Sequence, residues 1–191
     1  VLDPAQHLSG VDWNETQIRL YQQIMEFDID GGPADFTFTE RLARENGWTI
    51  DYTNRVIHEY KCFIFLIVNA DHPVTPSDQV DQAWHLHLTY TWSYWHRLCQ
   101  EIVGRPLHHT PTRGGYEEVE KFDARYGTTL KSYQLTFGTL PPTDIWPDTA
   151  TRFSSDFFFQ RVNTLRHWIF LKPPGIAMYL SVISIFLTLT V

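Results

Sequence analysis

The stretch Thr75-Pro-Ser-Asp-Gln-Val-Asp-Gln-Ala-Trp-His-Leu-His87 decides the expected fold, because it joins a helix start to the densest group of reactive side chains in the chain. Thr75 suits the N-cap of a helix, Pro76 the first helical position, and Asp78 the first turn, where the helix dipole favours negative charge. We therefore expect one long helix from Pro76 to about Val103 as the central element of the domain.

Apolar residues recur at helical spacing on both sides of this stretch. We expect helices over residues 14–27, 39–45, 49–69 and 157–171, and another over 116–126 with a continuation to 137 that Gly127 bends or interrupts. The run 62–68 is apolar all round and should lie in the core. Alternating strand patterns, internal repeats and low-complexity tracts are not evident in the sequence, so the fold class is expected to be all-α.

Amino-acid composition excludes some classes of protein. The 191 residues carry a formal net charge of -7 and include 43% hydrophobic residues, which is ample apolar surface for a folded core. An acidic chain without clustered Lys and Arg is not expected to bind nucleic acid. Its two cysteines, Cys62 and Cys99, form no disulfide framework.

Residues 173–191 contain no charged side chain and predict a single transmembrane helix in the lipid bilayer. The positive residues Arg161, Arg166 and Lys172 precede it, so the folded domain is expected on the cytoplasmic side. Small and weakly polar side chains recur along one stripe of this helix, which favours contact with a membrane protein: Ala177, Ser181, Ser184 and Thr188.

The chain is thus expected to comprise four parts. Residues 1–13 form an N-terminal arm, 14–140 a helical soluble domain, 141–172 an irregular and helical connector, and 173–191 the transmembrane helix.

Several side chains in the middle of the chain are candidate ligands for a transition metal such as zinc: Asp81, His85, His96, Cys99, His108 and His109. On a straight helix His85 and His96 lie about 16 Å apart along the axis, so one ion cannot bind both. Two smaller groupings remain. Asp81 and His85 form an i, i+4 pair, while His96 and Cys99 form an i, i+3 pair that His108 or His109 could join.

These pairs also have structural interpretations. Asp81 could hydrogen-bond His85 inside a buried helix, in which case both side chains face the interior. Cys99 could be an inert core thiol beside a surface histidine.

Three segments resemble the bacterial glycine-rich domain-containing proteins: 36–48, the stretch 72–87 with its Asp-x-x-Trp-His-x-His core, and 107–115. Tyr94, Cys99 and the His-His-x-Pro element follow in the order that the resemblance implies. It implies a helical domain over roughly 16–153, and it gives no enzymatic activity that could be carried over to this chain. The glycine-rich tail that names this family is replaced here by an apolar run.

We therefore expect a membrane-anchored, non-catalytic accessory or assembly subunit of a larger membrane complex. Surplus aromatic residues favour this interpretation, because aromatic side chains often anchor interfaces, and the candidates are Trp13, Trp92, Trp95, Trp146 and Trp168. Two alternatives stay open: a metal-binding protein or metal-dependent enzyme, and a protein-binding scaffold without metal.

Overall fold

The structure is a computed structural model of the 191-residue chain, and it describes residues 13–110 and 116–153, with side chains from 116 to 122 excluded. The chain divides into two compact units, Val1–Phe157 and Phe158–Val191, and every described residue belongs to the first. The described residues form helices and loops without any strand, which confirms the all-α prediction.

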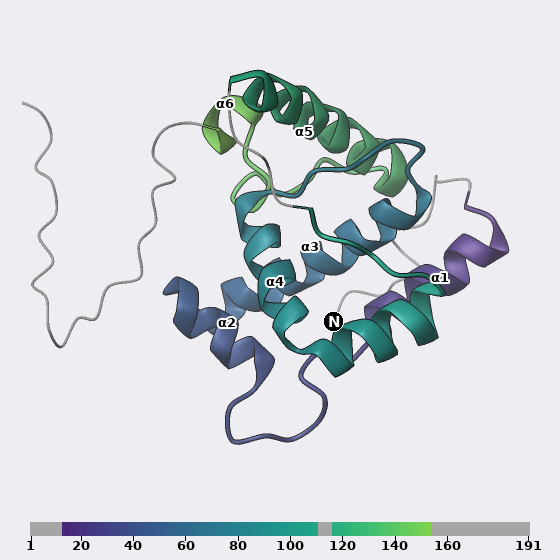
Figure 1. Ribbon diagram of the computed structural model, residues 1–191, viewed down its shortest axis with the longest axis vertical. Coiled ribbons are helices and arrows are strands. Elements are labelled where there is room, and N and C mark those ends of the chain that lie inside the picture. Colours follow the sequence, from purple (N-terminus) through teal and green to yellow (C-terminus); the bar gives the residue numbers. More distant parts are fainter. Residues whose placement is uncertain (1–12, 111–115, 154–191) are drawn as a thin grey trace, which may run out of the picture. The chain divides into compact units, whose positions relative to one another are not determined.

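Seven helices make up the described part of the chain: α1 (Glu15–Glu26), α2 (Phe38–Asn46), α3 (Ile50–Asn69), α4 (Asp78–Thr89), the π-helix η1 (Trp92–Val103), α5 (Tyr116–Phe137) and α6 (Thr149–Arg152). The middle of the arrangement is α3, which packs against α1, α2, α4 and α5 (Figure 1). The prediction that the helix starting at Pro76 is the central element was therefore wrong.

The apolar character of α3 explains why it takes the central place. Residues 62–66 are buried on every side, with exposures between 0% and 2%, while Ile67 and Val68 are partly buried, so the prediction of a core position is confirmed for most of the run 62–68. Rings from other elements close around it, including Trp13 and Phe137 against Phe65. A helix that is hydrophobic all round has to be covered by neighbours, and four helices cover this one.

Local capping signals set where the first helices begin. Asn14 caps α1 and forms a capping box with Gln17. Thr37 and Glu40 form the same reciprocal arrangement at α2. Gly47 ends α2 in the left-handed conformation at φ 69°, which a glycine adopts without steric cost.

The start of α4 differs from the prediction by two residues. Ser77 is the N-cap, since its hydroxyl accepts a hydrogen bond from the Val80 N–H at 3.2 Å. Thr75 is buried instead, and its backbone N–H donates to the Thr129 hydroxyl of α5 at 2.9 Å. A tertiary contact therefore holds Thr75 outside the helix and moves the cap to the next hydroxyl residue.

The expected helix from Pro76 to Val103 is broken at Tyr90. Tyr90 has φ -87° and ψ 62°, outside the helical region, and η1 follows with the wider π-helical turn. Side chains bond across the break: His87 Nε2 lies 3.1 Å from Ser93 Oγ, and the Trp84 indole N–H donates to the Tyr94 hydroxyl at 2.8 Å. Asp81 and His85 therefore lie before the break, and His96 and Cys99 lie after it.

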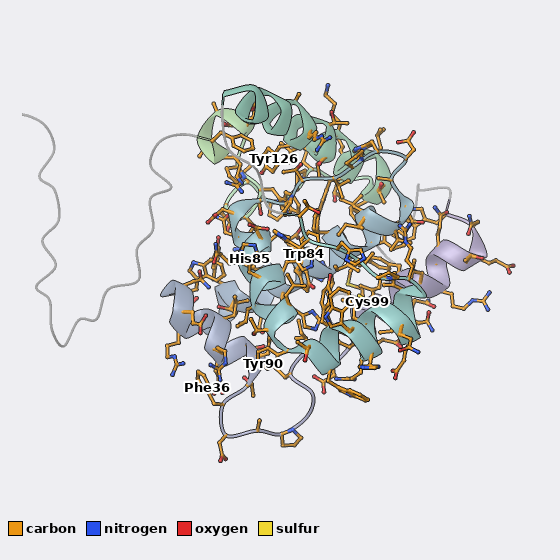
Figure 2. The ribbon with its side chains drawn as sticks, viewed as in Figure 1. Phe36, Trp84, His85, Tyr90, Cys99 and Tyr126 are labelled. Carbon is orange, nitrogen blue, oxygen red and sulfur yellow. The ribbon has the colours of Figure 1, made fainter. Side chains whose placement is uncertain are left out.

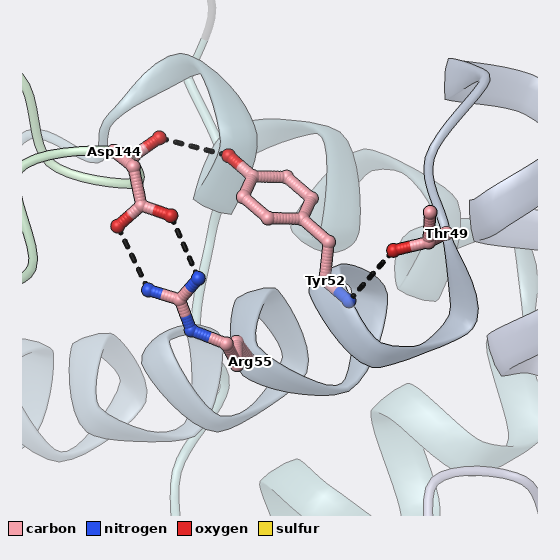
Figure 3. Close-up of polar contacts among 4 residues, drawn as sticks. All are labelled: Thr49, Tyr52, Arg55 and Asp144. Carbon is pink, nitrogen blue, oxygen red and sulfur yellow. Dashed lines mark hydrogen bonds and ion pairs between the residues drawn. The ribbon is translucent and has the colours of Figure 1, made fainter.

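The segment after α5, expected as part of a connector, packs against α3 (Figure 3). Both carboxylate oxygens of Asp144 accept from the Arg55 guanidinium, at 2.7 and 2.8 Å, and the Tyr52 hydroxyl donates to the Asp144 carbonyl oxygen at 2.8 Å. The ion pair is half-exposed, so it contributes only about 0.2 to 1 kcal/mol. Burial of Ile145 and Trp146, at 0% and 1% exposure, fixes the segment more firmly.

Two further expectations concern helices near the end of the chain. The predicted interruption at Gly127 does not occur, because α5 continues through this residue to Phe137. The predicted helix over 157–171 and the predicted transmembrane helix over 173–191 lie outside the described residues. Within the part that is described, no helix combines the length and the apolar character needed to cross a membrane.

Candidate metal centre

Three side chains from two parts of the chain lie close together. Asp81 and His85 lie one turn apart on α4, and His109 comes from the loop that follows η1. Their ligand atoms all lie within 4.8 Å of one another. His109 Nε2 is 2.9 Å from one oxygen of Asp81, and His85 Nε2 is 3.8 Å from the other. One carboxylate therefore faces two imidazoles, whose ring centroids are 4.5 Å apart.

The site is accessible from one side. The His85 side chain is 50% exposed, while those of Asp81 and His109 are 19% and 15% exposed. Figure 2 shows His85 and its neighbour Trp84 on α4. The prediction that both Asp81 and His85 face the interior was therefore wrong for His85, whereas Asp81 is hydrogen-bonded to a residue that the sequence had not paired with it.

Buried contacts hold His109 in place. The buried side chain of Leu107 anchors the loop two residues earlier, and its carbonyl oxygen accepts from the Tyr94 hydroxyl at 2.6 Å. The same hydroxyl accepts from the Trp84 indole, and the Trp84 ring lies edge-on to the His109 ring at 4.5 Å. A chain of contacts thus runs from α4 through η1 to the loop and positions the imidazole over Asp81.

Asp78 is a further acidic group in this neighbourhood, one turn before Asp81 on α4. Burial raises the pKa of its carboxyl, and the nearby charge of Asp81 raises it too, while Arg152 and His85 lower it. The candidate site therefore lies beside a second, partly buried carboxyl group.

The structure separates the other three predicted metal ligands from this cluster. His96 is exposed on η1 and stacks on Trp92 with ring centroids 4.0 Å apart. Cys99 is buried beside Tyr94, and burial raises the pKa of its thiol. His108 is exposed, with its ring 5.8 Å from that of Trp95. The wider π-helical turn places His96 and Cys99, three residues apart, in different environments.

Nothing in the sequence indicated a role for His87, which lies in the core and contacts two hydroxyl side chains there, those of Tyr60 and Ser93. The side chain is fully buried, and its Nδ1 lies 2.9 Å from the Tyr60 hydroxyl. Rings of Phe27, Phe38 and Tyr94 surround it at centroid distances of 5.2 to 5.8 Å. Burial lowers its pKa from 6.5 to about 3, so the imidazole is neutral and has a structural role.

The tryptophans named as interface anchors have different environments. Trp146 is a core residue at 1% exposure, and Trp13 is partly buried with its indole N–H donating to the Thr136 carbonyl oxygen. Trp95 is partly buried as well. Trp92 is 67% exposed, and Trp168 lies outside the described residues. Trp92 is therefore the described member of this set that is most available to a partner.

Comparison with known proteins gives one match. The model of a family described as UCP032817-like matches residues 35–121, somewhat less than half of the chain. This range contains all three residues of the candidate site. The comparisons with curated proteins and with solved structures found no match. The resemblance to glycine-rich domain-containing proteins stays a prediction.

Proposed function

We propose that the helical domain binds one divalent transition-metal ion through Asp81, His85 and His109, with Zn²⁺ as the first candidate. The observation that carries this proposal is the convergence of three ligand atoms within 4.8 Å. Two atoms bound to one Zn²⁺ at about 2 Å each are at most about 4 Å apart, so small side-chain rotations suffice. Imidazole nitrogen and carboxylate oxygen are both ordinary zinc ligands.

The ligand set supports an open centre more than a closed structural one. Structural zinc sites use four protein ligands, whereas catalytic sites use three and leave a position for water or substrate. The half-exposed His85 leaves the cluster accessible to solvent. Two histidines and one carboxylate also suit Fe²⁺, but Zn²⁺ binds nitrogen and oxygen sites more strongly. An ion here would lower the pKa of a bound water and polarise a substrate oxygen.

We expect the purified full chain, treated with a chelator and then dialysed, to bind Zn²⁺ in a titration calorimeter with one tight site. His85→Ala and His109→Ala should each weaken binding by at least about 100-fold, because even residues that only orient ligands contribute about 10- to 100-fold. His96→Ala is the matched control, since it removes an exposed histidine outside the cluster. Equal affinity in wild type, His85→Ala and His109→Ala would refute the site.

We also propose, as a second candidate function, that the chain is a membrane-anchored accessory or assembly subunit with its domain on the cytoplasmic side. The charge-free run 173–191 supports an anchor, and its stripe of Ala177, Ser181, Ser184 and Thr188 supports contact with a membrane protein. The exposed Trp92, Leu135 and Leu140 offer apolar surface to a partner. The metal site and the anchor are compatible, because they use different parts of the chain.

The anchor proposal is tested by flotation of the full chain with phosphatidylcholine vesicles. We expect the chain to float with the vesicles and to resist extraction at high pH, because an apolar helix in the hydrocarbon core is held by hydrophobic burial. Removal of residues 173–191 should leave the protein in the dense fraction. Flotation that is unchanged by this removal would contradict the anchor.

A further inference from the structure

A cavity of about 220 Å³ lies beside α3, on residues that the candidate metal site does not use. Trp13, Tyr21 and residues of α3 line it together with the end of α5 and the segment that follows. Leu140, with 73% of its surface exposed, is also in the lining, so the cavity reaches the protein surface. The volume is below the about 300 Å³ of the smallest drug-sized sites, which limits an occupant to a small group.

A buried carboxyl group lies in the wall of this cavity. Glu59 is 6% exposed, and its Oε2 accepts from the Trp146 indole N–H at 2.9 Å. Burial raises the pKa of this carboxyl group, while the Trp146 and Tyr133 donors lower it. An ionised carboxylate has about four acceptor positions, so two donors leave it able to accept further interactions. Burying such a charge is costly unless an opposite charge or several donors compensate it.

The positive charge around Glu59 is already engaged elsewhere. Arg55 lies one turn before Glu59 on α3, and its positive charge lowers the Glu59 pKa. Its guanidinium, however, forms a bidentate ion pair with the Asp144 carboxylate. The residues that line the cavity include neither lysine nor arginine. Of the lining residues, His58 is the one that can take up a positive charge, and its Nε2 lies 3.8 Å from the Cys62 Sγ. A cationic occupant would therefore supply a permanent opposite charge that the cavity wall itself lacks.

The remaining walls are rich in aromatic rings. Trp13, Tyr21, Tyr133 and Phe137 all line the cavity, and their rings lie close together. Ring centroids are 4.9 Å apart for Trp13 and Tyr21, 4.7 Å for Tyr133 and Phe137, and 6.0 Å for Trp13 and Phe137. Aromatic faces attract cations, and the attraction reaches about 2 kcal/mol when the cation is desolvated.

We propose that this cavity binds a small methylated ammonium ion, with the charge opposite the Glu59 carboxylate and the methyl groups against the aromatic walls. A quaternary ammonium group suits these walls because it carries a positive charge without N–H donors and presents an apolar surface. An inorganic cation or a lysine ammonium keeps strong hydration that the aromatic walls cannot replace. The ligand class is therefore choline-like.

Titration calorimetry on the full chain, with a chelator present so that metal binding cannot contribute, tests this proposal. The probes are choline and 3,3-dimethylbutan-1-ol, which has the same shape without the charge. We expect saturable choline binding and at least about tenfold weaker binding of the neutral alcohol, the ratio that about 1.4 kcal/mol of cation attraction gives. Equal affinity for the two probes, or no saturable heat with choline up to about 10 mM, would overturn the proposal.

Variants locate the binding site. Glu59→Gln keeps an acceptor for the Trp146 indole and removes the charge, so choline binding should weaken at least about tenfold while the alcohol is unaffected. Glu101→Gln, which removes an exposed acid on η1, is the control and should change neither affinity. Undiminished choline binding in Glu59→Gln would refute the assignment. If that variant fails to fold, the comparison of the two probes on the wild-type chain decides the question alone.

Discussion

Replacing Trp146 by alanine is expected to lower the free energy of unfolding by about 3 to 5 kcal/mol, the range for removing a large aromatic side chain from a core. The indole is 1% exposed and packs among Phe63, Tyr126 and Tyr133, with ring centroids 5.9 to 6.2 Å away. The substitution also removes a hydrogen bond from the buried Glu59 carboxylate. The void that the indole leaves and the loss of its N–H donor together destabilise the fold.

Urea unfolding followed by circular dichroism measures this effect. Trp92→Ala is the matched control, because Trp92 is 67% exposed and its removal should change stability by only about 0.5 kcal/mol. Trp146→Phe separates the two contributions, since it keeps a ring and removes the N–H donor. A Trp146→Ala protein as stable as Trp92→Ala would show that the segment after α5 does not pack into the core in solution.

His87 is expected to make the domain less stable as the pH falls below about 6.5. Burial lowers its folded-state pKa to about 3, whereas the unfolded chain takes up a proton near the ordinary value of 6.5. Between these two pH values the unfolded state binds more protons than the folded state, so stability decreases as pH falls, by about 1.4 kcal/mol per unit. Above about pH 6.5 the two states bind the same number and the contribution is constant.

This pH dependence is measured as the free energy of unfolding in urea at pH 5, 6 and 7. His87→Asn keeps a polar group near the position of Nδ1, which faces the Tyr60 hydroxyl, but cannot titrate, so its stability should fall by about 2 kcal/mol less than that of wild type between pH 7 and pH 5. His96→Asn, at an exposed histidine, should retain the wild-type slope. Identical slopes in all three proteins would mean that His87 is accessible to protons in the folded state.

Helix ends that are set by capping residues close to them in the sequence could be predicted from the sequence. Asn14 and Gly47 occupy the cap positions that their side chains and conformational freedom favour, and the run 62–66 is buried as its uninterrupted apolar character requires. The break at Tyr90 could not be predicted in this way. Contacts within the folded core hold it, through the pairs Trp84–Tyr94 and His87–Ser93, and helical periodicity does not report such contacts.

The candidate site shows the same division between local and distant information. The pairing of Asp81 with His85 follows from helical spacing and was visible in the sequence. The position of His109 beside Asp81 depends on the burial of Leu107 and on the hydrogen bond from the Tyr94 hydroxyl to the Leu107 carbonyl oxygen. No local sequence pattern encodes these contacts. The burial of Trp146, a candidate interface anchor, could not be predicted for a similar reason, because a segment rich in proline gives no periodicity from which burial can be inferred.

The hydrogen bond between Asp81 and His109 joins residues that are 28 positions apart in the chain. It therefore closes a loop that contains the end of α4, all of η1 and the turn beyond it. Closing a loop of this size costs chain entropy, and that cost depends only weakly on its length. The contact therefore ties the loop beyond η1 back to α4. Its loss would leave α4 and η1 in place, because Trp84 and Tyr94 are buried in the core and bond to each other, so the amide protons of the loop around His109 should exchange before those of the two helices.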